Sequence, residues 1–546
     1  MPELNSQTIN VGRLFSQDFY FHIPDYQRPF SWDVDNLTDL IDDLTAAPRD
    51  ADYFLGTLVL HEVGEATYDV VDGQQRLTAL CILIACIRDT GKIVDVVELQ
   101  DMLVQPARPL AGIQAKPRLH VKATTAFNDV VGTDGGTADQ LGLESLTGNE
   151  GSRYRNAVQI FHAGLAAMTD QQVQDLASFI IQRCVVIFLA AKSFDDAFRL
   201  FTVVNDRGKQ LRRIDILKAQ NVSPDVISDP TLRAAYAKKW EGLEDEIGEA
   251  HFEDIFHSLR LIYVQDKPQG DLLKEFEARI FGKPGRPTRG SNFIDTLGQY
   301  VELYDHLFVS RDYLDETPEA SRFTTLLNAM TSEFRASEWR ACLLQYARKF
   351  GKAGIYEFAL KIEKVYLEHW VSGMRKDERY ETYTDILKGI EVAKTGTMAT
   401  KLISADLEAI REGCRVKNFY TAGYAKYLLV RAEMLASELN EPRSFAVKSI
   451  EHVLPQNPGA DSQWLNDFSA EDIADVVHQA GNLVLLSKSK NSSAQNRDFS
   501  DKKQTYLIPR VSDFPRSLQT LQVDEWTREL IEARTAEFAA GILEDL

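Results

Sequence analysis

VVDGQQRLTAL, the stretch Val70–Leu80, decides the fold of the N-terminal part of this chain. The residues TYDVV that lead into it are typical of a strand end, and LTALCILIACI after it is typical of a buried helix. A strand, a turn at Gly73 and a helix start favour an anion, because the first backbone N–H groups lack helical partners. Arg76 could pair with a phosphate there, and Asp72 could reach a ribose hydroxyl or a magnesium ion. The structural alternative, with Asp72 as an N-cap and Arg76 in a surface ion pair, stays open.

Length and composition limit the class of protein. The chain has 546 residues, more than one hydrophobic core accommodates, so two or three domains are expected. Its 61 basic and 81 acidic residues give a net charge of −20, which excludes a broadly basic surface but not a local basic patch. The five cysteines form no CxxC pair, so neither disulfides nor a cysteine zinc site is expected. No signal peptide or bilayer-spanning run is visible, so we expect a cytoplasmic protein without membrane contact.

The rest of the chain predicts an α+β multidomain protein. Residues 1–125 mix short strand-like runs with amphipathic helical runs, and CVVIFLAAK at 184–192 is typical of a buried strand. Residues 131–155 are rich in Gly, Thr and acids and predict a surface excursion. From about 230 to 440 apolar residues recur at helical spacing. Residues 445–510 predict a strand, a loop, a second strand and a basic, asparagine-rich tail.

A second polar constellation lies in that C-terminal region. Glu451 and His452 end a strand-like run, Asn482 opens the apolar run LVLL, and Asn491 follows. Phosphodiester hydrolysis needs a base for water and a cation at the leaving oxygen. A neutral histidine suits the first task, and carboxylate and amide oxygens suit a magnesium ion. Because adjacent strand residues face opposite sides, Glu451 and His452 could share one site only at the strand end.

IEHVLPQ, GNLVLLSKSKN and the lysine-rich end together resemble the His-Me finger (HNH) nucleases. The resemblance implies that His452 is the general base and that Glu451 and Asn491 bind a magnesium or manganese ion. Asn482 joins His452 in the catalytic set by tying the loop after the first strand to the second strand. A local basic tail suits phosphates, so five residues are expected to contact DNA: Lys488, Lys490, Arg497, Lys502 and Lys503.

Three N-terminal stretches, IPDYQRPFSW at 23–32, DGQQRLT at 72–78 and FTVVNDRGKQL at 201–211, resemble the N-terminal domain of GmrSD-type restriction proteins. That domain is related to the ParB/sulfiredoxin-like nucleotide-binding fold, whose GxxRxxA box corresponds to Gly73, Arg76 and Ala79 here. Without the resemblance, YQRPF could be a loop with a packed aromatic, and NDRG a helix C-cap. The resemblance implies a nucleoside triphosphate bound by Gln27, Arg28, Asp72, Gly73, Gln74, Gln75, Arg76, Thr78, Asn205, Arg207 and Gly208.

The order of the parts is that of the GmrSD family, so three domains are predicted: 1–225 for nucleotide binding, 226–440 for helical coupling and 441–546 for the HNH nuclease. The resemblance implies a type IV anti-phage restriction endonuclease that cuts modified double-stranded DNA under control of NTP binding or hydrolysis. One alternative is a nuclease for DNA or RNA without modification dependence. Another is a nucleotide-regulated binding protein with an inactive nuclease relic. The modification recognised, the preferred NTP and the oligomeric state stay open.

Overall fold

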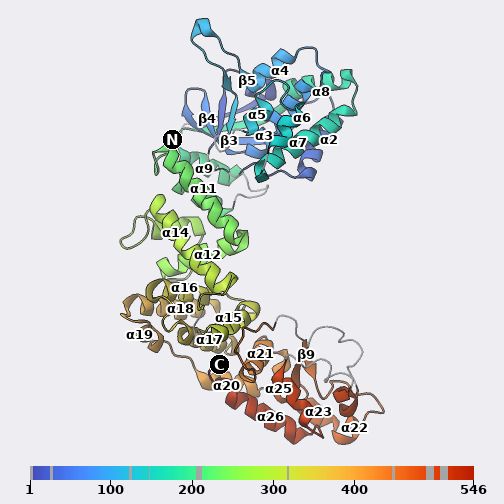
Figure 1. Ribbon diagram of the computed structural model, residues 1–546, viewed down its shortest axis with the longest axis vertical. Helices are drawn as coiled ribbons and strands as arrows, with labels where there is room; N and C mark the ends of the chain where they lie inside the picture. Colours follow the sequence, from blue (N-terminus) through green and yellow to red (C-terminus); the bar gives the residue numbers. More distant parts are fainter. Residues whose placement is uncertain are drawn as a thin grey trace. The chain divides into compact units, whose positions relative to one another are not determined.

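The computed structural model describes residues 4–24, 27, 29–121, 126–146, 148–204, 212–315, 319–445, 449–486, 497–504 and 514–546. They fall into two compact units, Met1–Lys238 and Lys239–Leu546, and each unit is described on its own (Figure 1). Strands and helices alternate in the first unit, whereas helices dominate the second. The α+β multidomain class predicted from the sequence is therefore confirmed. The division into three functional domains stays a prediction.

A mixed six-stranded sheet organises the first unit. Its spatial order is β1 (Leu4–Asn10), β8 (Cys184–Ala191), β3 (Tyr53–Gly64), β4 (Thr67–Asp72), β2 (Tyr20–Ile23) and β7 (Leu119–Val121). Strand β3 is parallel to β8, and β2 is parallel to β4 and β7, whereas β1–β8 and β3–β4 are antiparallel. A short separate pair joins β5 (Val104–Gln105) to β6 (Lys116–Pro117). Strands β4 and β8 confirm the two strands predicted at these positions.

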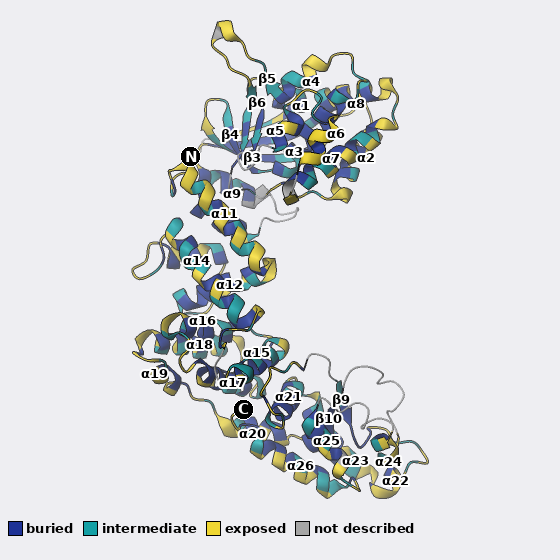
Figure 2. Ribbon diagram, in the orientation of Figure 1, coloured by how far each residue is buried: buried dark blue, intermediate teal, exposed yellow. Residues whose placement is uncertain are grey.

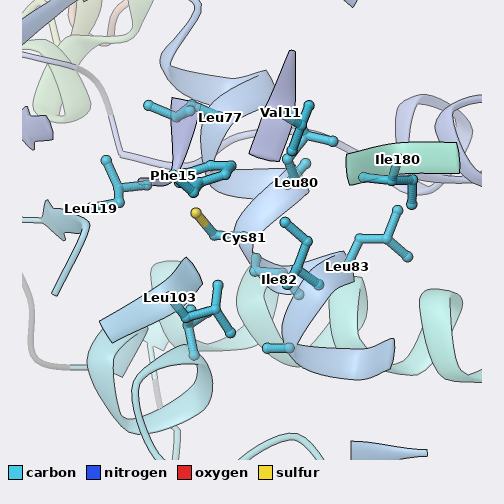
Figure 3. Packing of buried hydrophobic residues seen from close by; sticks show 14 of the residues in the cluster. Val11, Phe15, Leu77, Leu80, Cys81, Ile82, Leu83, Leu103, Leu119 and Ile180 are labelled. Carbon is cyan, nitrogen blue, oxygen red and sulfur yellow. The ribbon is translucent and has the colours of Figure 1, made fainter. Parts of the chain in front are cut away.

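Helix α3 (Gln74–Asp89) is central to the first core because its sequence is apolar on every side. Every residue from Leu77 to Arg88 is buried, as expected for a helix that is hydrophobic all round. Figure 3 shows its middle surrounded by other parts of the core, with Val11, Phe15, Leu103, Leu119 and Ile180 around Leu80, Cys81, Ile82 and Leu83. Burial raises the pKa of the Cys81 thiol, which therefore stays protonated. The surrounding core fixes the position of the polar turn at the start of the helix.

The other helices of the first unit include two in the segment predicted as a surface excursion. They are α1 (Val11–Leu14), α2 (Val34–Ala46), α4 (Val96–Leu103), α5 (Ala126–Val131), α6 (Gln140–Ser145), α7 (Gly148–Ala166), α8 (Asp170–Arg183), α9 (Phe194–Val204) and α10 (Arg213–Asn221). Helices α6 and α7 occupy much of residues 131–155, which the sequence did not predict, whereas most residues from 133 to 145 are exposed, as expected for a surface excursion. Leu143 and Tyr154 are buried in the core, and these apolar anchors outweigh the polar composition around them.

The second unit begins with a long helical series. Helix α11 (Pro230–Ile247) contains the boundary between the units. It is followed by α12 (Glu249–Val264), α13 (Leu272–Glu275), α14 (Ser291–Tyr304), α15 (Ala320–Glu333), α16 (Glu338–Phe350), α17 (Ile355–Val371), α18 (Lys376–Val392), α19 (Gly396–Lys401), α20 (Leu407–Arg415) and α21 (Ala425–Leu435). The helical pattern predicted for residues 230–440 is confirmed. Among the described helices, none combines the length and apolarity that crossing a membrane requires.

The C-terminal part of the second unit is built around a two-stranded antiparallel ribbon. Strand β9 (Ser449–His452) pairs with β10 (Leu483–Leu486), with His452 opposite Leu483. The helices around it are α22 (Trp464–Asp467), α23 (Ala470–Val476), α24 (Phe499–Lys502), α25 (Pro515–Leu518) and α26 (Arg528–Gly541). A small core that includes Val453, Trp464 and Trp526 holds the ribbon. Figure 2 shows buried positions along β10 and α25, and this burial fixes the strand end where His452 lies.

Buried polar contacts tie this C-terminal part to the helices before it. Arg431 on α21 pairs with Glu363 on α17 at 2.9 Å, and neither side chain is exposed. The same guanidinium donates to the carbonyl of Glu544 at 3.0 Å. Glu433 on α21 accepts from Ser517 Oγ at 2.7 Å, and Ser517 in turn accepts from the backbone N–H of Leu485 on β10. Helix α21 therefore contacts both the end of the chain and the ribbon.

Candidate functional site

Glu451 and His452 lie at the last two positions of β9, and each is 8% exposed. The sequence argument required the strand to end there for both side chains to serve one site, and β9 does end at His452. The two side chains have different neighbours. Glu451 contacts Lys502, whereas His452 contacts His478 and Gln456. The strand end therefore gathers a carboxylate, a lysine and two imidazoles.

Lys502 is buried at this strand end. Its ammonium donates to Glu451 Oε1 at 3.1 Å and to the His452 carbonyl at 2.7 Å, and its side chain has no exposed surface. Lys502 was predicted to contact DNA phosphates, and that prediction was wrong for this structure. A basic stretch of sequence shows which residues carry positive charge but not which way their side chains point. Here a buried carboxylate needs a cationic partner, and Lys502 supplies it.

The other predicted DNA contacts differ in position. Lys503 is half-buried and donates to the Val523 carbonyl at 2.6 Å, whereas Arg497 is exposed. Lys488 and Lys490 lie outside the described residues, as does the predicted metal ligand Asn491. Arg497 is thus the exposed member of the described part of this set, and a phosphate contact by it stays a prediction.

The His452 imidazole lies in a mostly buried environment. One of its ring nitrogens, Nε2, is 3.1 Å from His478 Nδ1, and its ring lies 4.4 Å from the Tyr420 ring centre to centre. Burial, with smaller contributions from His478 and Lys502, lowers the pKa of His452 to about 3. At neutral pH the imidazole is therefore uncharged. Sequence reasoning missed His478, although its position four residues before Asn482 was visible.

Asn482 is fully buried and all its hydrogen-bonding capacity is used. Its Oδ1 accepts from the Leu454 backbone N–H at 2.8 Å and from Trp526 Nε1 at 3.0 Å. Its Nδ2 donates to the carbonyls of Leu454 at 2.9 Å and Val477 at 2.8 Å. An asparagine amide offers two donors and two acceptor positions, so none remains for a substrate. Asn482 ties the loop after β9 to the start of β10 and is a positioning residue rather than a catalytic one.

Gly481, the neighbour of Asn482, permits close approach of helix α26. A Cβ atom at this position would overlap the Ile531 carbonyl oxygen on that helix. The Gly481 N–H donates to Thr535 Oγ1 at 3.0 Å, and the Gly481 carbonyl accepts from Arg534 Nε at 3.0 Å. Glycine is therefore required here by contact with α26.

A divalent cation fits the chemistry of this donor set in part. Glu451 already holds a cation, the Lys502 ammonium, so its surroundings favour positive charge. No group of three His, Cys, Asp or Glu side chains suited to a metal occurs within the part of the chain that the structure describes. A metal with few protein ligands and several waters is the arrangement typical of magnesium, which prefers oxygen ligands.

The N-terminal polar turn has the predicted strand–turn–helix geometry. Strand β4 ends at Asp72, Gly73 adopts a left-handed φ of 89°, and α3 begins at Gln74. A Cβ atom at Gly73 would overlap Leu58 on β3, so the turn requires glycine for both conformation and space. No side chain caps the helix at Gly73, so the first backbone N–H groups of α3 are not satisfied by a cap there.

Arg76 lies beside this turn and packs over Gly56 on β3, where any Cβ atom would overlap its guanidinium. It makes no hydrogen bond or ion pair with the described residues, and burial lowers its pKa. Burial also raises the pKa of Asp72, against the opposing effects of the Gly73 N–H and of Arg76. A partly buried guanidinium beside a helix start is suited to an anion.

Two of the predicted nucleotide-binding glutamines hold a loop instead. Gln27 Nε2 donates to the carbonyls of Val70 at 3.0 Å and Val71 at 2.9 Å, which fastens its loop to β4. Gln75 Oε1 accepts from the Ser31 N–H at 2.7 Å, and its Nε2 donates to the Pro29 carbonyl at 3.2 Å. Both side chains therefore shape the loop that precedes α2.

The remaining predicted nucleotide-binding residues fall into two groups. Gln74 is 7% exposed and Thr78 is 1% exposed, so both face the protein interior rather than the open side of the turn. Arg28, Asn205, Arg207 and Gly208 lie outside the described residues. The structure thus brings together Asp72, Gly73 and Arg76 of the predicted set at the turn before α3.

Comparison with known families matches both ends of the chain. Residues 11–222 match the N-terminal domain of the GmrSD restriction endonuclease, and residues 405–540 match the C-terminal domain of GmrSD restriction endonucleases. A search of the curated proteins finds no match. The first matched region contains the turn at Gly73, and the second contains the strand end at His452.

Proposed function

Because the chain belongs to the GmrSD restriction endonuclease family, we propose that it is a type IV restriction endonuclease that protects against phages by cutting modified double-stranded DNA. Cleavage takes place at the end of β9 with a divalent cation, and an NTP bound at the start of α3 controls it. The observation that carries the proposal is the end of β9, which places the mostly buried His452 next to Glu451.

His452 acts as the general base for cleavage. Burial keeps its imidazole unprotonated at neutral pH, which is the form that a general base needs. Glu451 and Asn491 would hold a magnesium or manganese ion, which when bound stabilises the charge on the leaving oxygen. Asn482 keeps the loop after β9 in register with β10, which fixes the orientation of the His452 backbone.

Control by a nucleotide is supported by the turn between β4 and α3. The backbone N–H groups at the start of α3 and the Arg76 guanidinium can bind phosphate oxygens, and Gly73 lets the phosphates approach the backbone closely. Asp72 is positioned next to them for a ribose hydroxyl or for a cation that accompanies the phosphates.

The experiment is digestion of phage DNAs that differ in modification, with magnesium or manganese and with or without each NTP. His452→Ala should reduce the cleavage rate by ~10²–10⁴, because that is the usual contribution of a general base. His257→Ala, a change at an exposed histidine on α12, is the matched control and should cut like the parent. Cleavage by His452→Ala at the parent rate would remove His452 from the site.

The same experiment separates the rival functions. Equal cutting of modified and unmodified DNA would favour a nuclease without modification dependence. A parent protein that cuts none of these DNAs, nor RNA added in parallel, with either divalent ion, but binds NTP by calorimetry, would favour a nucleotide-regulated binding protein. The Lys502–Glu451 ion pair is the observation that supports this last function, because Glu451, a predicted metal ligand, already binds the Lys502 ammonium.

A further inference from the structure

A cavity of about 290 Å³ lies in the second unit, where α17 ends and where α16 and α18 begin. No residue predicted to belong to the nuclease or nucleotide sites lines it. Its volume is near the lower limit of about 300 Å³ for ligand pockets, which suits one small ligand. The side chains that carry the argument are Arg335, Tyr366, His369, Trp370 and Arg379.

One wall of the cavity is aromatic and rigid. The Tyr366 ring stacks on Phe334 with centroids 3.7 Å apart and an interplanar angle of 3°. Its hydroxyl accepts from the Ala336 N–H at 3.1 Å, which fixes the ring further. Trp370 is half-buried and meets Tyr366 edge to face, with centroids 5.6 Å apart. Tyr366 is 6% exposed and one face of its ring is covered by Phe334, so Trp370 is the ring of this wall on which a nucleobase can stack.

The rim of the cavity is positively charged. Arg335 is exposed, and its side chain makes no hydrogen bond or ion pair with the described residues. Arg379 Nη2 donates to Glu338 Oε1 at 3.4 Å, which is longer than a strong charge-assisted bond, and its Nε has no partner. Two arginines against one glutamate leave net positive charge. The N-terminus of α16 lies at the same place without a side-chain cap, which adds to the attraction for an anion.

The floor of the cavity contains polar groups that lack partners. His369 is 3% exposed, and its Nδ1 has no hydrogen-bond partner among the described residues. Arg379 Nε at the rim and Glu338 Oε2 beside it also lack partners within this described part of the chain. Burial and Arg379 lower the pKa of His369 to about 4, so its ring is uncharged at neutral pH and is an additional hydrogen-bonding group rather than a charge. Buried polar groups in native proteins are normally paired, so such a cluster points to a missing polar partner.

We propose that this cavity binds one nucleotide, with the base against Trp370 and the phosphate on Arg335. A flat aromatic group and an anion are the two chemistries that the wall and the rim accept together. The nucleotide could be free in solution or could be unstacked from a DNA strand. The proposal does not rest on nuclease activity or on the turn at Gly73, because it concerns different residues of the second unit.

The test uses full-length protein with His452→Ala, so that DNA is not cut, and Arg76→Ala, so that the N-terminal candidate site is removed. Calorimetry measures binding of dCMP, of deoxycytidine and of inorganic phosphate. Fluorescence anisotropy measures binding of a DNA duplex with one unpaired nucleotide and of its fully paired counterpart. Each is repeated with Arg335→Ala, Arg335→Lys and, as a control, Arg322→Ala, an exposed arginine on α15 that does not line the cavity.

We expect dCMP to bind more tightly than phosphate or deoxycytidine. Arg335→Ala should weaken it about tenfold, Arg335→Lys less, and Arg322→Ala not at all, with equal melting temperatures throughout. Tighter, Arg335-dependent binding of the duplex with the unpaired nucleotide would identify DNA as the source, and binding of dCMP alone would identify a free nucleotide. Absence of binding by every probe, or equal affinities in all variants, would overturn the proposal. Equal binding of phosphate and dCMP would overturn the role of the aromatic wall.

Discussion

Replacing Lys502 by methionine should make the stability of the second unit depend on divalent metal. The Lys502 ammonium has no exposed surface and lies 3.1 Å from Glu451 Oε1. Methionine has a similar length but no charge, so Glu451 loses its lysine partner. The Glu451 residue is only 8% exposed, so water does not replace that partner fully. Breaking a buried ion pair by removing one partner costs about 3–5 kcal/mol of unfolding free energy. A metal ion on Glu451 restores ~2.7 kcal/mol when its free concentration is one hundred times its Kd.

The measurement is urea unfolding with EDTA and with saturating magnesium, on the parent and on Lys502→Met. Lys503→Met is the matched control, because Lys503 is the neighbouring half-buried lysine and bonds a backbone carbonyl rather than a carboxylate. Magnesium should recover more stability in Lys502→Met than in the parent or the control. An equal metal effect in all three proteins would show that Glu451 does not bind the ion.

Arg76→Ala should weaken NTP binding about ten- to hundredfold, and Arg76→Lys should recover only part of it, because lysine lacks the planar fork; calorimetry beside a thermal melt would expose a mere stability effect. Glu451→Ala and Asn491→Ala should each raise the metal concentration needed for DNA cleavage, since each removes an oxygen ligand; unchanged metal titrations in both would exclude them as ligands. Acid should destabilise the second unit through His369, whose folded pKa of about 4 lies below the ordinary value of 6.5. The unfolded chain then binds the extra proton, so the free energy of unfolding should fall by about 1.4 kcal/mol per such residue between pH 7.5 and 5.5. Urea unfolding at both pH values should give a smaller fall in His369→Gln, and an equal fall would refute the assignment.

Local pattern was sufficient to predict the strand–turn–helix at Gly73 and the two strands of the C-terminal ribbon. In both places the change from a β-branched run to a polar turn is contained within about ten residues, so periodicity and turn chemistry decide the structure. Helices α6 and α7 within residues 131–155 were not predicted, because only a few apolar anchors, including Leu143 and Tyr154, hold the segment to a distant core.

Roles that depend on long-range packing could not be predicted from local sequence. Lys502 and Lys503 are adjacent and chemically identical, yet Lys502 is buried against Glu451 and Lys503 is half-buried at a backbone carbonyl. Gln27 and Gln75 carry the amide groups expected of ligand contacts. Both amides instead make hydrogen bonds that hold the loop before α2, Gln27 to β4 and Gln75 to the Ser31 N–H. Which neighbour a polar side chain meets is set by the tertiary fold rather than by its own residue type.

The buried pair Gly481–Asn482 has an evolutionary consequence. Gly481 is required by its contact with α26 and Asn482 by the loop after β9, so both residues are constrained by folding alone. His452, by contrast, is constrained by the proposed catalytic role. Where a lineage loses catalysis but keeps the folded protein, we expect the glycine–asparagine pair to persist while the histidine drifts. A genome survey that selects sequences by the glycine–asparagine pair would therefore include both inactive relatives and active nucleases. The presence of the histidine would distinguish the two.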